Sequence, residues 1–345
     1  YKRQVLSEYD RLDIDSKIPI QKPVRPEECI CSYEIGSNEE AEHKMILAGG
    51  WVYGRFDELE KDIACSVLAE LLCSSNESPL KRAILEKGLA EDVELGKIDG
   101  IQQSYLKLVI RNTSEEKKEE VWDTIYTTLK TLASQGMDHK RLESILSRME
   151  FNMREKESGS FPEGVMHAIQ MLESCLYGGD PAQNLCYNQV FSSIRNKIEK
   201  GYFEQLIKEV LLENPHYARI SLQPSKTLGE EKRIRERERL QTIKEQWSEE
   251  ERQKVVGEFQ YLREVQGTPD SPEQLAALPM LSLSDISEEV EEVSQVVTEV
   301  EGNQVLLQRL ETEGITHITY YFSLEDQTLE AVSYTHLTLP TTPYV

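Results

Sequence analysis

Histidine pairs are the clearest way in which this chain could do chemistry, because two histidines four residues apart on a helix can hold one zinc ion. A glutamate between them would act as general base for the metal-bound water. The chain holds six histidines, which are His43, His139, His167, His216, His317 and His336. No two of them are four residues apart, so an H-x-x-E-H zinc motif is absent. The nearest look-alike, EEAEH at 39–43, is expected in an exposed loop, because it has one histidine and zinc needs three positioned ligands.

The cysteines and serines also lack the spacing of a reactive site. The six cysteines are Cys29, Cys31, Cys65, Cys73, Cys175 and Cys186, and none of them forms C-x-x-C. Cys29 and Cys31 alternate along an expected strand, so they point to the same face. We expect the cysteines to be reduced core residues, with a zinc cluster as the less favoured alternative. No nucleophile-elbow sequence surrounds Ser78, Ser158 or Ser160.

Of three other features, one is excluded as a binding site and two allow a binding role beside a structural one. ESGSFPEG at 157–164 lacks the glycine and lysine spacing of a phosphate loop. Trp51 and Tyr53 alternate on an expected strand and could line a chamber, although a core position is favoured. The acidic residues Glu91, Asp92 and Glu94 could face a basic peptide, and the simpler interpretation is a solvated strand edge. The sequence therefore assigns no catalytic and no metal-binding residue.

Composition excludes some classes of partner. The net charge of −23 argues against a general nucleic-acid binder, which needs a basic surface to replace counterions. An acidic surface suits basic partners or keeps the protein in solution. No apolar run approaches the roughly 18 residues of a membrane span, and YKRQVLSEYDRLD has no apolar signal-peptide segment. We therefore expect neither a nucleic-acid nor a membrane partner.

The order of the expected elements indicates an α+β fold with an antiparallel sheet covered by helices. Residues 1–26 are a proline-containing connector, and residues 27–225 form the α+β domain. The expected strands of this domain are 29–35, 44–54, 91–100, 101–112 and 216–225. A helix with Ile63, Val67 and Leu71 on one face follows the second strand, and Ser78 is expected to cap a short helix over 79–87. Further helices are expected over 121–132, 142–149, 164–176 and 184–212, and Asp138 is a suitable cap for the second of these.

A linker follows the α+β domain. The segment 227–265 is almost wholly charged or helix-favouring, and it predicts a long exposed helix with a narrow apolar stripe. Gly267 and Pro269 end that helix, and Ser271 caps a short new one that starts at Pro272. The linker spans 226–290. Residues 291–330, which include QVVTEV, QVLLQRLETEG and ITHITYYFSL, are predicted to begin a further α+β domain with strands that cannot bury a sheet face alone.

Three stretches together resemble the presequence-protease branch of the pitrilysin/insulinase zinc metallopeptidases. They are EYDRLDIDSKIPIQKP (8–23), SSNESPLKRAILEKGLAEDV (74–93), and the charged helix with LPMLSLSDI (278–286) and the acidic run after it. The third stretch is the most specific, and the likeness covers about residues 5–328. VSYTHLTLPTTPYV (332–345) departs from the family pattern, and we expect the tail 331–345 to be an artefact of sequence assembly or of a vector.

The resemblance implies four homologous α+β units in two halves, which a helical hairpin joins and which close around an unfolded peptide. This chain would match the second unit, the linker and the first strands of the third. The zinc motif would then lie upstream of Tyr1, and a substrate-binding Arg and Tyr pair downstream of Val345. The missing N- and C-terminal domains of the same chain and unfolded peptides would be its partners. The parent would use zinc, whereas this fragment would bind none and be inactive alone.

The functional hypothesis is an interior, non-catalytic part of a zinc metalloendopeptidase that degrades short unfolded peptides, acting as chamber wall and hinge. The alternative is an inactive binding or assembly subunit of the same fold, and a third is an acidic helix-rich scaffold. A bacterial cytoplasm is the expected compartment, because we expect the cysteines to be reduced and see no signal peptide in the sequence. An organelle matrix stays open as the alternative.

Overall fold

The structure is a computed structural model, and it describes residues 10, 12–23, 28–155, 161–278, 282–285, 294–310, 312, 314–323 and 328. The chain forms two compact units, residues 1–290 and 291–345. Within the described part, no helix is long and apolar enough to span a bilayer. The predicted tail at 331–345 lies outside the described residues. The finer domain boundaries stay a prediction.

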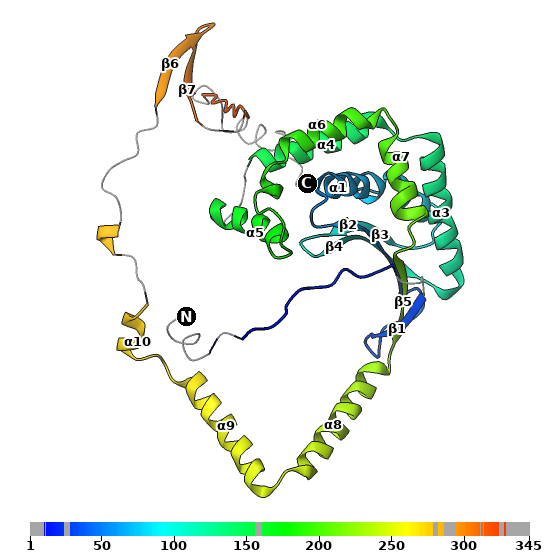
Figure 1. Ribbon diagram of the computed structural model, residues 1–345, viewed down its shortest axis with the longest axis vertical. Helices are drawn as coiled ribbons and strands as arrows, with labels where there is room; N and C mark the ends of the chain where they lie inside the picture. Colours follow the sequence, from blue (N-terminus) through cyan, green and yellow to red (C-terminus); the bar gives the residue numbers. More distant parts are fainter. Residues whose placement is uncertain are drawn as a thin grey trace. The chain divides into compact units, whose positions relative to one another are not determined.

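The first unit contains a five-stranded sheet. Its strands are β1 (Glu28–Glu34), β2 (Met45–Arg55), β3 (Asp92–Ile98), β4 (Gln103–Thr113) and β5 (Tyr217–Ser225). Their order across the sheet is β1-β5-β2-β4-β3, which Figure 1 shows from one side. The α+β class is confirmed, but β1 and β5 pair in parallel, so the sheet is not wholly antiparallel. β5 lies between β1 and β2, and it runs antiparallel to β2 and parallel to β1.

Seven helices of the described chain lie on one side of this sheet (Figure 1). They are α1 (Leu59–Cys73), α2 (Pro79–Leu85), α3 (Lys118–Gln135), α4 (His139–Glu155), α5 (Glu163–Cys175), α6 (Asn188–Ile198) and α7 (Tyr202–Ile207). Short helical turns complete this layer at Glu115–Lys117, Gln183–Leu185 and Lys208–Leu212. β2 shows why the helices lie on one face, because its buried residues Leu47 and Trp51 alternate with half-buried ones. The apolar face of α1, which includes Val67 and Leu68, closes the core against them.

Two local predictions for the helices are wrong in detail. The pattern over 184–212 is divided, because Gly201 adopts a left-handed φ of 75° that begins a new helix. Ser78 stands at the N-cap position of α2, but its hydroxyl makes no cap hydrogen bond. It instead accepts hydrogen bonds from Ser75 N (3.1 Å) and from Arg141 Nη2 (2.9 Å). The cap at Asp138 is confirmed, because its carboxylate accepts from Arg141 N at 3.1 Å.

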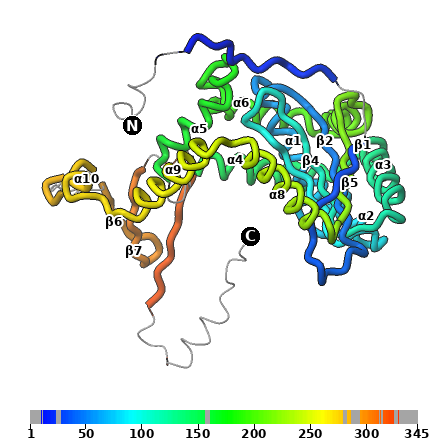
Figure 2. The backbone as a smooth tube through the Cα atoms, turned by 90° about the horizontal axis from the view of Figure 1, so that it is seen from below, coloured from blue at the N-terminus to red at the C-terminus, as the bar shows by residue number. Residues whose placement is uncertain are grey.

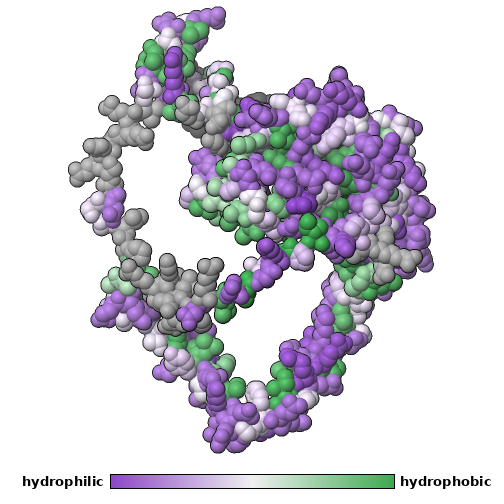
Figure 3. Space-filling model, viewed as in Figure 1, coloured by the Kyte–Doolittle hydropathy of each residue, from purple (hydrophilic) through white to green (hydrophobic). Residues whose placement is uncertain are grey.

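The predicted long helix of the linker is two helices, α8 (Leu228–Gln246) and α9 (Glu249–Gly267). Trp247 takes an extended conformation with ψ of 137°, and Ser248 starts α9 with a capping box to Glu251. The S-x-x-E pattern of this capping box is present in the sequence at 248–251. The prediction of a single helix followed the continuous run of charged residues instead. α9 has no buried residue, and the hydrophilic surface of the linker is visible in Figure 3.

The end of the linker agrees with the prediction. Ser271 caps α10 (Pro272–Ala276) by accepting from Gln274 N at 3.3 Å, and Pro272 takes the first helical position. The packing of α8 and α9 as a hairpin stays a prediction.

The second unit contains a two-stranded antiparallel sheet of β6 (Gln295–Val300) and β7 (Asn303–Gln308). The third predicted strand, ITHITYYFSL, is wrong for residues 315–323, which the structure describes without strand pairing. Tyr320, Tyr321 and Phe322 are exposed there. A hairpin alone buries too little apolar surface to hold a third strand.

Candidate functional site

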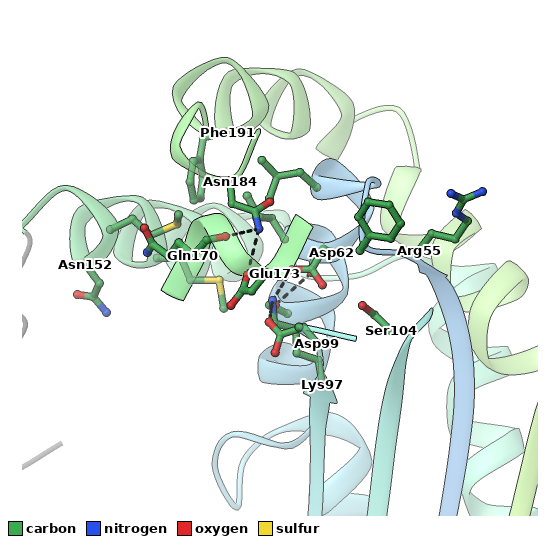
Figure 4. A pocket seen from close by; sticks show the side chains of 17 residues that line it. Arg55, Asp62, Lys97, Asp99, Ser104, Asn152, Gln170, Glu173, Asn184 and Phe191 are labelled. Carbon is green, nitrogen blue, oxygen red and sulfur yellow. Dashed lines mark hydrogen bonds and ion pairs between the residues drawn. The ribbon is translucent and has the colours of Figure 1, made fainter. Parts of the chain in front are cut away.

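A pocket of about 380 Å³ lies beside the N-terminal half of α1 (Figure 4). Residues from the end of β2, the end of β3, α4, α5 and the segment before α6 surround it. Its polar and charged lining consists of Arg55, Asp62, Ser66, Lys97, Asp99, Ser104, Asn152, Gln170, Glu173 and Asn184. Its apolar lining includes Phe56, Leu59, Met149, Met153 and Phe191. The pocket therefore combines apolar walls with a group of charges.

Lys97 is the centre of that group of charges. Its ammonium pairs with Asp62 and lies 2.8 Å from Asp99 Oδ2. Burial alone would lower the pKa of Lys97, but attraction to the carboxylates of Asp62 and Asp99 outweighs it and raises the pKa. The Tyr53 hydroxyl donates to Asp62 Oδ1 at 2.5 Å, and burial followed by the charge of Asp62 raises the pKa of Tyr53. Lys97 is thus held as a cation between two carboxylates.

Glu173 faces the same pocket from α5. Asn184 Nδ2 donates to its Oε2 at 3.1 Å and to the Gln170 carbonyl at 3.1 Å. Burial, and then the nearby charge of Asp99, raise the pKa of Glu173. Figure 4 shows Glu173, Asp99 and Asp62 converging on the lysine from different elements.

Local structure explains how these side chains reach the pocket. Lys97 shares the helix-facing side of β3 with Val93 and Leu95, because alternate residues of a strand face the same way. Asp99 follows that strand directly, and the left-handed Gly100 (φ 67°) turns the chain toward β4. Asp62 lies near the N-terminus of α1, where the helix dipole favours a carboxylate.

This arrangement can bind a cation. Three carboxylates face two cations, and one of the cations, Arg55, also pairs with Asp57 at 3.3 Å. No histidine is among the described residues that line the pocket, so the hydroxyls of Ser66 and Ser104 have no imidazole base there. A side chain with an apolar stem and a positive end would match both the walls and the charges.

A second, more open hollow of about 710 Å³ shares Leu59 with the first. Its lining is rich in carboxylates, namely Asp57, Glu58, Glu60, Asp180 and Glu209. Glu60 is paired with Lys197, and Lys61 lies 4.0 Å from Glu209. The surface beside the start of α1 is therefore acidic over both hollows.

The histidines lie in separate places. His43 is in an exposed loop, where Glu39 of EEAEH pairs with Lys44 and accepts from Gly36 N at 3.0 Å. His139 begins α4 at 3.9 Å from Glu204, and His167 lies on α5 at 3.8 Å from Glu163. His216 is buried before β5, while His317 lies in the second unit and His336 outside the described residues. No group of three metal-ligating side chains occurs among the residues that the structure describes.

The cysteine prediction is correct only for α1. Cys65 and Cys73 are buried there, and burial raises the pKa of Cys65 and raises that of Cys73 to about 12. The other four cysteines are exposed, so their predicted core position is wrong; they are Cys29, Cys31, Cys175 and Cys186. Cys29 and Cys31 lie on β1, which is an edge strand of the described sheet and pairs there with β5 alone.

The remaining candidate residues are either buried in the core or paired with neighbouring side chains. Trp51 and Tyr53 belong to the core. Asp92 pairs with Lys81 at 2.7 Å, which lowers the pKa of Asp92, and Glu91 accepts from Asn112 at 2.6 Å. Glu94 lies 3.5 Å from Arg111, so each of these three acids has a partner on α2 or on β4.

The described part of 157–164 begins at Phe161, and Ser158 and Ser160 lie outside the described residues. Sequence reasoning missed Asp62, Lys97, Asp99 and Glu173. They are spread along the chain from residue 62 to residue 173, and no short motif links them.

Comparison with protein families establishes the relationship. Residues 3–149 match the family model described as "Peptidase M16 inactive domain", and residues 222–339 match the model of the region associated with the C branch of the same M16 peptidases. The chain belongs to the M16 peptidase family. The second match overlaps the start of the tail predicted at 331–345, whose origin stays a prediction.

The curated M16-related proteins extend the likeness over nearly the whole chain. "Protein HypA" of Clostridium perfringens is 30% identical over 97% of this chain and 34% of its own length. "Presequence protease 1, chloroplastic/mitochondrial" of Arabidopsis thaliana is 30% identical over 94% of this chain and 31% of its own length. The chain thus spans about a third of the length of these relatives. Among solved structures, a protease from Helicobacter pylori is 15% identical, with a TM-score of 0.47 over 65% of this chain and 51% of that one.

Proposed function

We propose that this chain is an interior, non-catalytic part of a zinc metalloendopeptidase that degrades short unfolded peptides. The α+β domain would form the wall of a peptide chamber, and the linker with α8 and α9 would act as its hinge. The observation that carries the proposal is the match of residues 3–149 to an inactive M16 domain. The absence of a three-ligand metal group among the described residues is compatible with it.

Zinc belongs to the parent enzyme in this proposal. When bound there it would activate a water molecule for attack on a peptide bond. The residues of this chain do not fit such an ion, because its described histidines lie on separate elements and none lines the pocket. Their role is to bind and orient peptide.

The pocket at Lys97 then takes a basic side chain of the peptide. The apolar stem of a lysine or arginine would pack on Phe56, Leu59 and Met153, and its charge would meet Glu173 and Asp99. The acidic second hollow would extend this preference to neighbouring basic residues. The same acidic lining would speed the encounter with cationic peptides.

The catalytic part of the proposal is tested by incubating the purified chain with unfolded peptides, with and without added zinc, and following products by mass spectrometry. No cleavage is expected in either sample. The matched control is the full-length parent, which should cleave the same peptides only with zinc. Zinc-dependent cleavage by the chain alone would contradict the proposal.

The binding part is tested by fluorescence anisotropy with a labelled unfolded basic peptide. Asp99→Asn should weaken binding several-fold, and Glu236→Gln on the exposed α8 is the matched control that should not. A peptide whose lysines are replaced by norleucine should bind the unsubstituted chain and Asp99→Asn equally. Equal affinity of both variants for the basic peptide would remove the pocket from the proposal.

The alternative of an inactive binding or assembly subunit shares the inactive-domain match. The two functions differ in the parent gene. An H-x-x-E-H sequence encoded upstream in the same reading frame would support the peptidase. An intact reading frame without that motif would support the binding subunit and exclude the enzyme.

A further inference from the structure

Two exposed thiols stand side by side on β1. The Sγ atoms of Cys29 and Cys31 are 3.4 Å apart, and both residues are exposed. The other two exposed cysteines, Cys175 and Cys186, belong to the region of α5 and the turn after it. The pair on β1 is therefore separate from the pocket at Lys97.

The position of β1 keeps these thiols open to solvent. β1 is the first strand in the sheet order, and it pairs with β5 so that Cys29 lies opposite Ile220 and Cys31 opposite Leu222. On β2, the partners of Ile220 and Leu222 are Ala48 and Ile46, which alternate with the buried Leu47. The two thiols thus lie on the sheet face that the helices leave uncovered. Figure 2 shows β1 and β5 together at this edge.

Strand geometry permits a disulfide here and makes it strained. Two residues of extended chain span about 6.6 Å between Cα atoms, and disulfides occur with Cα atoms up to about 6.8 Å apart. The sulfurs must also approach from 3.4 Å to a bond of about 2.05 Å. β1 must shorten locally to allow this, and a strained disulfide is more easily reduced.

We propose that Cys29 and Cys31 form a reversible dithiol–disulfide site that exchanges with low-molecular-weight disulfides such as oxidised glutathione. The thiolate of one cysteine attacks the small disulfide, forms a mixed disulfide and releases one small thiol. The second cysteine then attacks the mixed disulfide and releases the second small thiol. Two protein thiols lose two electrons and two protons, and the small disulfide gains both.

Pairing of β1 with β5 opposes the oxidised state. The extended conformation that pairs with β5 holds the Cα atoms near the upper limit for a disulfide, whereas a free peptide can shorten without losing strand hydrogen bonds. The folded chain should therefore favour the dithiol more than an isolated peptide of residues 27–34 does. By linkage, oxidation should loosen the edge strand by the same factor.

The test uses the full chain with Cys175→Ser and Cys186→Ser, which removes the other exposed thiols and leaves the buried Cys65 and Cys73 in place. The protein is equilibrated with mixtures of oxidised and reduced glutathione, quenched with acid and analysed by intact mass and peptide mapping. We expect loss of two hydrogens, mapped to one peptide that contains Cys29 and Cys31. The exchange equilibrium constant should be several-fold smaller than for the isolated peptide 27–34.

A matched variant isolates the second step of the exchange. Adding Cys29→Ser to the same chain should trap a stable glutathione adduct on Cys31, because no second thiol can release it. Two glutathione adducts on the chain that carries only Cys175→Ser and Cys186→Ser would overturn the proposal. No reaction of Cys29 or Cys31 in that chain would also overturn it. An equilibrium constant equal to that of the peptide would overturn the linkage to β1 pairing.

Discussion

At the residue scale, the positive charge of Lys97 lies near the carboxylates of Asp62, Asp99 and Glu173. Its side chain is 25% exposed and that of Asp62 is 18% exposed, so their pairing is partly screened by water. Lys97→Met should lower the free energy of unfolding by about 2 kcal/mol, below the range for a fully buried pair, because it leaves half-buried carboxylates without their cation. Urea unfolding at neutral pH measures this.

The control for Lys97 keeps the charge. Lys97→Arg should lose much less stability than Lys97→Met, and combining Lys97→Met with Asp62→Asn should recover part of the loss. If Lys97→Met and Lys97→Arg were equally destabilised, packing and not charge would explain the role of Lys97.

Glu173 makes a prediction of opposite sign. Its pKa is raised in the folded state, so ionised Glu173 opposes folding and its contribution to stability falls as pH rises from the unfolded pKa through the folded one. The Glu173→Gln variant should therefore be more stable than the unsubstituted chain at pH 7. The Oε1 atom of the new glutamine can still accept the hydrogen bond from Asn184. Thermal unfolding followed from pH 7 downward should show this advantage vanish below about pH 4, near the unfolded pKa. An advantage that grew on acidification would contradict the assigned shift.

Among the strands and helices, β2 contains two adjacent glycines with different surroundings. A Cβ on Gly49 would lie 2.5 Å from Trp51 Cη2 and 3.2 Å from Trp122 Cη2, whereas one on Gly50 would lie 3.8 Å from Tyr105 Cδ2. Trp51 is 1% exposed and is packed within the core. Gly49→Ala should cost about 2 kcal/mol of unfolding free energy through overpacking. Gly50→Ala is the matched control and should stay within about 0.5 kcal/mol.

The start of α9 is held by a capping box of two side chains. Ser248 Oγ accepts from Glu251 N at 3.2 Å, and Glu251 Oε2 accepts from Ser248 N at 2.7 Å, which lowers the pKa of Glu251. Ser248→Ala should destabilise this helix end by about 1 kcal/mol. Amide hydrogen exchange in the first turn of α9 should then be about fivefold faster. Thr242→Ala, inside α8, should leave those amides unchanged, and equal exchange in both variants would exclude the cap.

At the scale of the whole molecule, the buried core residues lie in the stretch of sequence that runs from β1 to β5 in the first unit. α9 buries no residue and α8 buries only Gly229, although both helices are rich in lysine and arginine. Limited trypsin digestion should therefore cut first within 232–263 and leave a resistant fragment that contains the sheet and its helices. Mass spectrometry of the early fragments measures this, and early cleavage inside α1 or α3 would contradict it.

Elements whose signals are local could be predicted from the sequence. β2, α1 and β5 follow from short apolar periods, and Asp138 and Ser271 cap helices as predicted because a cap needs only its own first turn. The α+β class followed from the order of these elements, and the M16 relationship from three stretches of residues. The same local logic predicted core positions for Cys29 and Cys31, which fails because a single strand does not reveal that it lies at an edge.

Features that depend on distant residues arise only when the chain folds. The insertion of β5 between β1 and β2 makes one pairing parallel, although β1 and β5 lie at opposite ends of the domain's sequence. Lys97, Asp99 and Glu173 meet because α5 packs near the end of β3, and no spacing in the chain encodes that approach. The pocket and the exposed thiol pair both arise from which surfaces the fold covers, and burial is a property of the packed molecule that no local pattern contains.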